Sequence, residues 1–172
     1  MISLLNKKNI VLVGMPGSGK TTIGRLLGNA LNMDFCDMDE YIVKKENMSI
    51  SDIFKKGEEH FRSIEINAVE EISRLSNLVI ATGGGVVTKE INIKNLKING
   101  IVIFINRPIS NILEDLEIEN RPLLKDNKKQ LKKIYDDRIS LYKKFSDIEI
   151  VNDSSTEIFI EKLLSNLERR II

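Results

Sequence analysis

The sequence has a single cysteine and no tryptophan, and it lacks a secretory pattern at its start. Cys36 alone can form neither an internal disulfide nor a cysteine zinc site. The first nine residues hold only a short apolar run before Lys7 and Lys8, which is not the pattern of a signal peptide. We therefore expect a cytoplasmic protein whose stability does not depend on disulfides.

An excess of charge of one sign is also lacking. Lys and Arg number 26 against 25 Asp and Glu, a net charge of +1, so no overall field draws the chain to nucleic acid or to an anionic membrane. Hydrophobic residues make up 42% and charged residues 30%, a balance typical of a soluble globular domain. No linker or repeat divides the 172 residues. We expect one domain over residues 1–172, a monomer with small-molecule partners, no nucleic acid and no membrane.

Short apolar runs alternate with segments of helical periodicity along the chain. The predicted strands are 10–13, 33–36, 78–81, 101–105 and 148–151, and the predicted helices are 21–31, 40–46, 51–75 with an interruption at Gly57, 131–145 and 156–167. Residues 114–127 are highly polar and contain Pro122, which predicts a mobile loop. The apolar strands predict an α/β fold with a parallel sheet between two helical layers, and in such folds ligands bind at the carboxyl ends of the strands.

Residues 14–21, GMPGSGKT, match the phosphate-binding loop pattern in full and lie between a predicted strand and a predicted helix. The glycines let backbone N–H groups turn inward around an oxyanion, and the helix directs its positive end at the same place. Lys20 can reach the β- and γ-phosphates, and the Thr21 hydroxyl can bind Mg²⁺. The guanine-reading Asn-Lys-x-Asp pattern fails at Gln130, which favours ATP. The expected ATP contacts from this segment are Gly14, Gly17, Ser18, Gly19, Lys20, Thr21 and Thr22.

Two carboxylates follow the second predicted strand. The strand at 78–81 runs into Thr82 and glycines, so it supplies no acid for a metal-bound water. Asp37 and Asp39 are two residues apart, and an extended backbone would project both toward the same side. One can serve the metal and the other the substrate. Alternatively, Asp39 caps the helix that starts near Glu40.

Arginines and a glycine triplet suggest a site for a second, anionic small molecule. The glycines at 83–85 directly follow an apolar strand, which favours close approach of a ligand to the backbone. Arg62 and Glu65 are neighbours on one helical face, a spacing that most often forms a weak surface pair. Arg62 and Arg138 can together grip a carboxylate in a forked geometry. Arg121, in the polar loop, can swing over the triphosphate and neutralise charge.

In this order and over essentially the whole chain, the motifs resemble those of the shikimate kinase family. They are residues 14–21, FCDMD at 35–39, Gly57-Glu58 with Phe61-Arg62 and Glu65, the glycines at 83–85, Arg121-Pro122-Leu123-Leu124, and Arg138 with Leu141-Tyr142. The resemblance implies transfer of the ATP γ-phosphoryl group to the 3-hydroxyl of shikimate. It also implies a three-layer P-loop kinase fold, with a five-stranded parallel sheet in the order 2-3-1-4-5 and a mobile lid over about 114–127.

The resemblance further implies a role for each candidate residue. Lys20, Asp39 and Arg121 would be catalytic, with Asp39 on the substrate hydroxyls and Arg121 coming from the lid. Thr21 and Asp37 would organise Mg²⁺, the expected cofactor beside the co-substrate ATP. Residues of about 34–65 would form most of the substrate-binding region. The implied shikimate contacts are Asp39, Arg62, Gly83, Gly84, Gly85 and Arg138.

One departure from the family concerns the adenine. The family often carries an arginine on the helix before the lid that stacks on adenine, whereas residues 112–116 here are ILEDL. Residues 151–153 resemble the other adenine wall of the family, which adds Asp153 to the expected ATP contacts. Cys36 and His60 lie inside the motifs, and we expect a buried strand thiol and a helix-surface imidazole.

Three alternatives share part of this pattern. A gluconate-type kinase should show a His-Pro pair after its acidic strand end, and a nucleoside-monophosphate kinase an Asp-Gly-aromatic-Pro-Arg entry to its lid. Neither pattern occurs in the sequence. A non-catalytic ATP-binding module would have no need of Asp37, Asp39 and a separate pair of arginines.

Overall fold

The computed structural model describes residues 8–118 and 125–171. The strands are β1 Asn9–Val13, β2 Asp34–Asp37, β3 Leu78–Ala81, β4 Gly100–Asn106 and β5 Ile148–Val151. The helices are α2 Lys20–Leu31, α3 Met38–Glu46, α4 Ile50–Phe54, α5 Glu58–Ser73, the 3₁₀ helix η1 Val86–Thr88, α6 Glu90–Ile98, α7 Ile109–Ile118, α8 Lys125–Phe145 and α9 Thr156–Ile171. The predicted strands are confirmed to within a residue at most ends.

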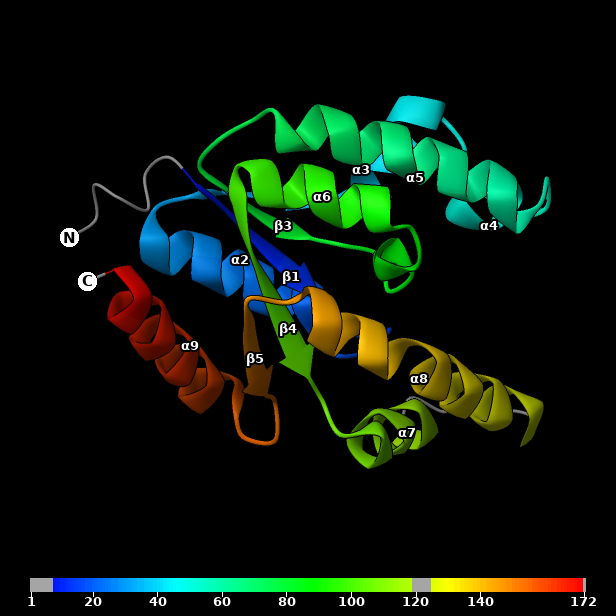
Figure 1. Cartoon of the computed structure of the whole chain (residues 1–172). Coiled ribbons are helices and arrows are strands. Elements are labelled where there is room, and N and C mark those ends of the chain that lie inside the picture. Colours follow the sequence, from blue (N-terminus) through cyan, green and yellow to red (C-terminus); the bar gives the residue numbers. More distant parts are fainter. Residues whose placement is uncertain (1–7, 119–124, 172) are drawn as a thin grey trace.

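The five strands form one parallel sheet in the order β2-β3-β1-β4-β5, which confirms the predicted order (Figure 1). β1 lies at the centre, with Val11 paired to Ile80 of β3 on one side and to Val102 of β4 on the other. The carboxyl ends of all five strands therefore meet at one edge of the sheet. The chain turns directly from the central strand β1 into the phosphate loop at this edge.

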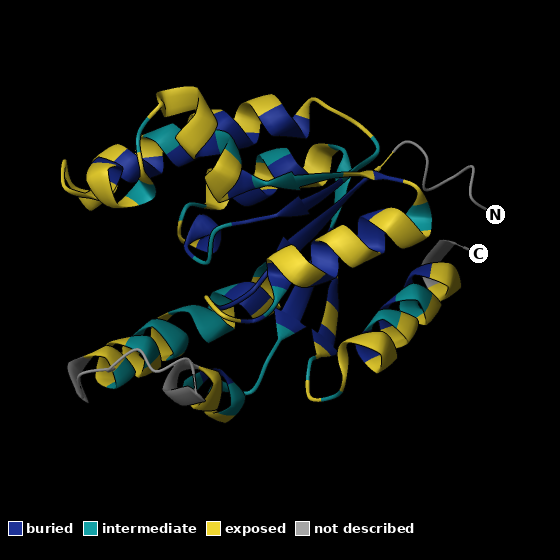
Figure 2. Cartoon of the chain, turned by 180° about the vertical axis from the view of Figure 1, so that it is seen from behind, coloured by how far each residue is buried: buried dark blue, intermediate teal, exposed yellow. Residues whose placement is uncertain are grey.

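Alternate side chains of the central strands β3, β1 and β4 enter two different hydrophobic cores. Val11 and Val13 pack into the core under α3, α5, α6 and α8, whereas Ile10 and Leu12 pack into the core under α2 and α9. Because both faces of the sheet are covered, every residue of β1 is buried. Figure 2 shows the central strands mainly in dark blue between helices whose outer faces are yellow. Burial on both faces explains why β1, β3 and β4 are nearly continuous apolar runs, whereas the edge strand β5 alternates buried and exposed residues.

Local signals end several helices where the sequence predicts. Gly57 has a φ of 111° and separates α4 from α5, as expected for a conformation that strains any side chain with a Cβ. Asn32, with a φ of 53°, ends α2, and its N–H donates to carbonyls of the last turn. The turn at Asn32 leads from α2 into β2, and the turn at Gly57 leads into α5, whose buried side chains pack into the core on one face of the sheet.

Two segments differ from the predicted elements. The helices α7 and α8 extend into residues 114–127 from both sides, so the loop predicted there is wrong at its two ends; the part between, 119–124, lies outside the described residues. The helix α6 was not predicted, because only Asn92, Ile93 and Leu96 of it are buried and lysines and asparagines mask the period. Among the described residues, no helix has the length and hydropathy needed to cross a bilayer.

Candidate active site

The phosphate loop joins the central strand to α2 and is shaped by its glycines. Gly17 and Gly19 have φ values of 78° and 94°, in the left-handed region that favours glycine. A Cβ at Gly14 would lie 2.7 Å from the carbonyl oxygen of Ile105, so the loop passes too close to β4 for any other residue there. The loop curls over the N-terminus of α2, whose free N–H groups and positive dipole end face the same space.

The ammonium group of Lys20 is enclosed by the loop itself. Its Nζ donates to the carbonyl oxygens of Gly14, at 2.9 Å, and Met15, at 2.8 Å. Burial lowers the pKa of Lys20 from 10.5 to about 8, against the opposing attraction of Asp39 and Asp37. Lys20 therefore carries its charge at neutral pH, at the place where an anion would sit.

Asp37 connects the loop to α3. One carboxylate oxygen accepts from the Thr21 hydroxyl at 2.7 Å, and the other accepts from the backbone N–H groups of Asp39, at 3.0 Å, and Glu40, at 3.2 Å. Asp37 is thus the N-cap of α3. The alternative that Asp39 caps this helix is wrong, and so is the extended geometry expected for the two acids, because Asp39 already lies in the first turn.

The two acids nevertheless face one cavity. A space of about 360 Å³ is lined by the phosphate loop, Asp37, Asp39 and the segment that begins at Thr82. Burial is the main cause that raises the pKa of Asp39, and the neighbouring Asp37 adds to it, while Lys20 and Arg62 oppose it. Asp39 therefore holds a proton more readily than an exposed aspartate does, as a proton acceptor requires.

The oxygen atoms of Thr21 and Asp37 suit a magnesium ion. Mg²⁺ prefers hard oxygen ligands and is usually held by one or two protein groups together with phosphate oxygens and water. Among the described residues, no group of three or more His, Cys, Asp or Glu side chains is placed to hold a metal. The hydroxyl and carboxylate beside the phosphate loop match this sparse type of site.

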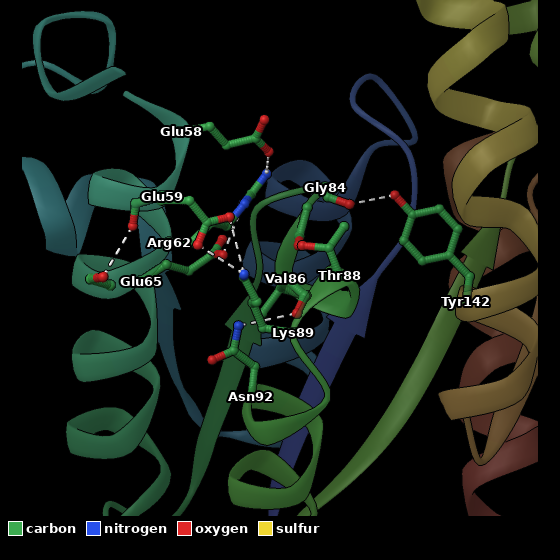
Figure 3. A network of polar contacts seen from close by, with 12 residues as sticks. Glu58, Glu59, Arg62, Glu65, Gly84, Val86, Thr88, Lys89, Asn92 and Tyr142 are labelled. Carbon is green, nitrogen blue, oxygen red and sulfur yellow. Dashed lines mark hydrogen bonds and ion pairs between the residues drawn. The ribbon is translucent and has the colours of Figure 1, made fainter. Parts of the chain in front are cut away.

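Arg62 is buried, not exposed as its spacing to Glu65 most often implies. Its side chain is 5% exposed, and the Glu65 carboxylate, at 2.9 Å from Nη1, is 1% exposed. Glu58 contacts Nη2 at 3.0 Å from the solvent side. Figure 3 shows the guanidinium between these two acids. The weak surface pair considered from the sequence is therefore wrong, and the pair instead fixes the Arg62 guanidinium in place.

The glycine triplet is required by the packing of the protein itself. A Cβ at Gly85 would fall on the Arg62 guanidinium, and one at Gly84 would lie 2.8 Å from Cδ of Pro16. A Cβ at Gly83 would meet oxygens of Asp39 and Glu65, each at 3.3 Å. The triplet lines the cavity that contains Arg62 and Arg138, but it is the close approach of protein side chains that excludes a larger residue here.

Arg62 and Arg138, which the sequence analysis expects to grip one carboxylate, line the same small cavity. This cavity of about 150 Å³ also includes Asp39, Phe54 and Phe61, and Asp39 lines the phosphate cavity as well. The two phenylalanines stack with centroids 4.3 Å apart and give the cavity an apolar wall that sequence reasoning missed. Nothing in the local pattern of α4 marks Phe54, because its role depends on α4 folding back against α5.

The position of Arg138 is set by Tyr142, one turn later on α8. The Tyr142 hydroxyl donates to the Gly84 carbonyl at 2.5 Å (Figure 3). Its ring stacks on Phe104 with centroids 5.1 Å apart. Burial raises the pKa of Tyr142 to about 12, so the hydroxyl stays a donor. This contact ties α8 to the glycine triplet and thereby to the cavity that Arg138 lines.

The ATP contacts expected outside residues 14–21 do not all lie in the phosphate cavity. Thr22 and Asp153 line a second cavity of about 330 Å³ beside the loop, with Arg107, which sequence reasoning missed, and Thr22 lines the phosphate cavity as well. Arg121 lies outside the described residues. His60 is exposed as predicted, whereas Cys36 is only half-buried, which corrects the expectation of a buried thiol.

A family model described as "Shikimate kinase" matches residues 16–168. The chain belongs to the shikimate kinase family. The shikimate kinase of Clostridium botulinum strain Alaska E43 is 46% identical over 157 residues, which cover 91% of this chain and 95% of that protein. Family membership confirms the activity class expected from the motifs, an ATP-dependent kinase, and sets the rival kinases and the non-catalytic module aside.

Solved structures of shikimate kinases share the whole architecture. The enzyme from Acinetobacter baumannii in complex with shikimate matches with a TM-score of 0.88 and 32% identity, covering 98% of this chain and 97% of that one. The enzyme from Aquifex aeolicus matches with a TM-score of 0.84 and 36% identity, covering 95% and 98%. The predicted P-loop kinase fold is confirmed.

Proposed function

We propose that the chain transfers the γ-phosphoryl group of ATP to the 3-hydroxyl of shikimate, with the residue roles given below. The observation that carries this proposal is the place of Asp39. It lines both the cavity of the phosphate loop and the smaller cavity of Arg62 and Arg138. A hydroxyl acid whose carboxylate lies on the arginines therefore presents a hydroxyl near Asp39 and the γ-phosphate.

In the proposed reaction, the substrate hydroxyl attacks the γ-phosphorus while the bond from this phosphorus to the β,γ-bridging oxygen breaks. Asp39 orients the hydroxyl and takes its proton, and ADP leaves with the bridging oxygen. Lys20 neutralises the charge that develops on the β- and γ-phosphate oxygens. Phosphoryl transfer passes through a loose transition state, so positioning and charge neutralisation contribute most of the acceleration. Arg121, outside the described residues, would add a further positive charge.

Thr21 and Asp37 would hold Mg²⁺, which supplies shielding of the β- and γ-phosphate oxygens when it is bound with ATP. The hydrogen bond between these two side chains places both oxygens at the mouth of the loop, 2.7 Å apart. The N-cap contacts fix the other Asp37 oxygen, so the carboxylate is oriented before any metal arrives.

The shikimate carboxylate would bind Arg62 and Arg138. Glu58 and Glu65 pair with the two terminal nitrogens of Arg62 and hold its guanidinium rigid, and the Tyr142 hydroxyl ties α8 to Gly84. A planar guanidinium binds a carboxylate with two parallel hydrogen bonds, which an ammonium group cannot do. The backbone at Gly83, Gly84 and Gly85 would complete the pocket.

Arg138→Lys is expected to weaken shikimate binding although it keeps the charge, because lysine loses the forked donor geometry. The KM for shikimate should rise by about tenfold, the equivalent of about 1.4 kcal/mol, with the KM for ATP nearly unchanged. Steady-state kinetics with each substrate varied in turn measures both constants. Wild-type values for both would show that Arg138 does not bind the carboxylate.

The substrate is tested by measuring ADP formation with shikimate, gluconate and a nucleoside monophosphate at equal concentrations. We expect rapid ADP formation with shikimate alone, because only shikimate combines a ring hydroxyl with a carboxylate at the span of this pocket. Gluconate offers a flexible chain that loses more conformational entropy on binding. A faster reaction with gluconate or the monophosphate would refute the proposal.

We also propose that the chain acts as a single domain over 1–172 and as a cytoplasmic monomer, with about 34–65 forming the substrate side and about 114–127 the lid. The single domain is supported by the sheet, which both hydrophobic cores share. The monomer is supported by large exposed apolar side chains that lie singly on different helices of the described residues, such as Leu26 on α2, Ile98 on α6 and Ile158 on α9.

A further inference from the structure

The cavity beside the phosphate loop contains polar groups that the proposed phosphoryl transfer does not use. It has a volume of about 330 Å³ and lies between the start of α2, the segment from β4 into α7, and the loop from β5 to α9. Gly19 and Thr22 line both this cavity and the phosphate cavity, so the two adjoin at the start of α2. A molecule whose phosphates lie in the loop can therefore extend into this space.

Arg107 is held in this cavity at two points. Its Nη1 donates to the carbonyl oxygen of Gly17 at 2.9 Å, and its Nη2 pairs with Asp115 of α7 at 2.6 Å. The side chain is only 22% exposed, although it follows the last residue of a strand. A guanidinium fixed in this way remains planar, and it has more N–H donors than the two contacts use.

Asn152, in the loop from β5 to α9, also lines the cavity and contacts Ser18, the residue that follows Gly17 in the phosphate loop. The Asn152 amide nitrogen donates to the carbonyl oxygen of Ser18 at 3.1 Å. In a planar trans peptide the C=O and the following N–H point in opposite directions, so this contact turns the Gly19 N–H away from Asn152. The loop thus has a support for its phosphate-binding shape that does not depend on Arg107.

An unpartnered hydroxyl also lies in the loop from β5 to α9. The Ser154 Oγ is shielded from solvent and has no hydrogen-bond partner among the described residues. Buried polar atoms are nearly always hydrogen-bonded, directly or through water or a ligand. The cavity therefore combines a fixed guanidinium on one wall with an unpaired polar atom on the other, as a polar heterocycle with a sugar would require.

We propose that Arg107 binds the nucleoside part of ATP on the α7 side of this cavity, using the donors and the guanidinium plane that Gly17 and Asp115 leave open. The residue comes from the segment between β4 and α7, whereas residues 112–116 within α7 carry no arginine. The inference rests on the proposed function only in taking ATP as the phosphoryl donor.

The test compares a nucleotide with a phosphate chain that has no nucleoside. Calorimetry without shikimate measures the binding of ADP and of inorganic tripolyphosphate to the wild-type chain, to Arg107→Ala and to Arg74→Ala. Arg74 is a matched control, since it forms a surface ion pair with Glu70 at the end of α5. We expect Arg107→Ala to weaken ADP binding by about tenfold, as loss of a charged hydrogen-bonding contact typically does. Tripolyphosphate binding should be unchanged, because Asn152 still supports the loop, and Arg74→Ala should bind both ligands as the wild type does.

A second variant keeps the test decisive if a thermal melt shows that Arg107→Ala is not folded at the temperature of the binding experiment. Arg107→Lys retains a charge that can reach Gly17 but has neither the plane nor the fork, so it should lose part of the ADP affinity and none of the tripolyphosphate affinity. Equal weakening of both ligands would overturn the inference, because Arg107 would then only brace the loop. Unchanged ADP binding would overturn it as well. Failure of the proposed function would appear separately, as a wild-type chain that binds ADP yet does not phosphorylate shikimate.

Discussion

Lys20→Ala is expected to reduce turnover by about 10³-fold, the upper range for removal of one group that stabilises transition-state charge. Among the described residues, Lys20 is the lysine that lines the phosphate cavity, so alanine leaves the charge developing between the β- and γ-phosphates without this partner. Turnover is measured under saturating ATP and shikimate. Lys94→Ala, which removes a surface ion pair with Glu90 on α6, is the control and should retain wild-type turnover.

The same variant should show a change in the pH dependence of stability. Burial lowers the pKa of Lys20 from 10.5 to about 8, so between these values the unfolded chain binds a proton that the folded chain has released. Through this group, the free energy of unfolding of the wild type therefore rises with pH from about 8 to about 10.5. Lys20→Ala should fold normally and lack this rise. Turnover near the wild-type value in a folded variant would remove the assignment of the loop as the ATP site.

Asp39→Asn is expected to reduce turnover by about 10²-fold or more, because the amide keeps the size of the side chain but loses its charge and basicity. Weaker shikimate binding should accompany the loss, since Asp39 also lines the arginine cavity. The KM for ATP and the Mg²⁺ concentration that gives half-maximal activity should be preserved. Kinetics with ATP, shikimate and Mg²⁺ each varied in turn separates these effects.

Asp37→Asn is the matched comparison for Asp39→Asn. Asparagine is as good an N-cap as aspartate, so α3 should still begin at Met38 and the fold should be retained. The amide is a poorer ligand for Mg²⁺, so the variant should need more Mg²⁺ for activity while keeping much of its turnover at saturation. If Asp39→Asn shifts only the Mg²⁺ dependence and leaves saturated turnover intact, the two roles are reversed.

Features defined by short stretches of sequence could be predicted well. The loop at 14–21 depends on glycines and on a lysine at fixed spacing, and the break at Gly57 depends on a single residue. The strand order was implied by the resemblance to the shikimate kinase family, which the motifs in their order carry, and not by any strand by itself. The residues that determine the loop and the break are close together in the chain. The strand order depends instead on the whole set of motifs and their order.

Features that depend on distant contacts could not be predicted in the same way. The spacing of Arg62 and Glu65 is compatible with a surface pair, and only the packing of Gly85 against the guanidinium shows why both charges are buried. The contact of Arg107 with Gly17 spans 90 residues, and no local pattern marks it. The position of Asp39 depended on where α3 begins, and a shift of two residues changed which acid caps the helix.

The carbonyl contacts of Lys20 have a consequence for the release of product. When ADP departs, the ammonium group does not face an empty, desolvated loop, because the carbonyl oxygens of Gly14 and Met15 accept its hydrogen bonds. Leaving a buried charge without such acceptors would add several kcal/mol to the free energy of the vacated enzyme, by the general penalty of about 3–5 kcal/mol for an uncompensated buried charge. The carbonyl contacts therefore reduce the free-energy difference between the nucleotide-bound and the nucleotide-free enzyme. A site that attracts triphosphate strongly can for this reason still release the diphosphate. In kinetic terms, the backbone carbonyls at the end of β1 favour fast release of ADP and hence repeated turnover.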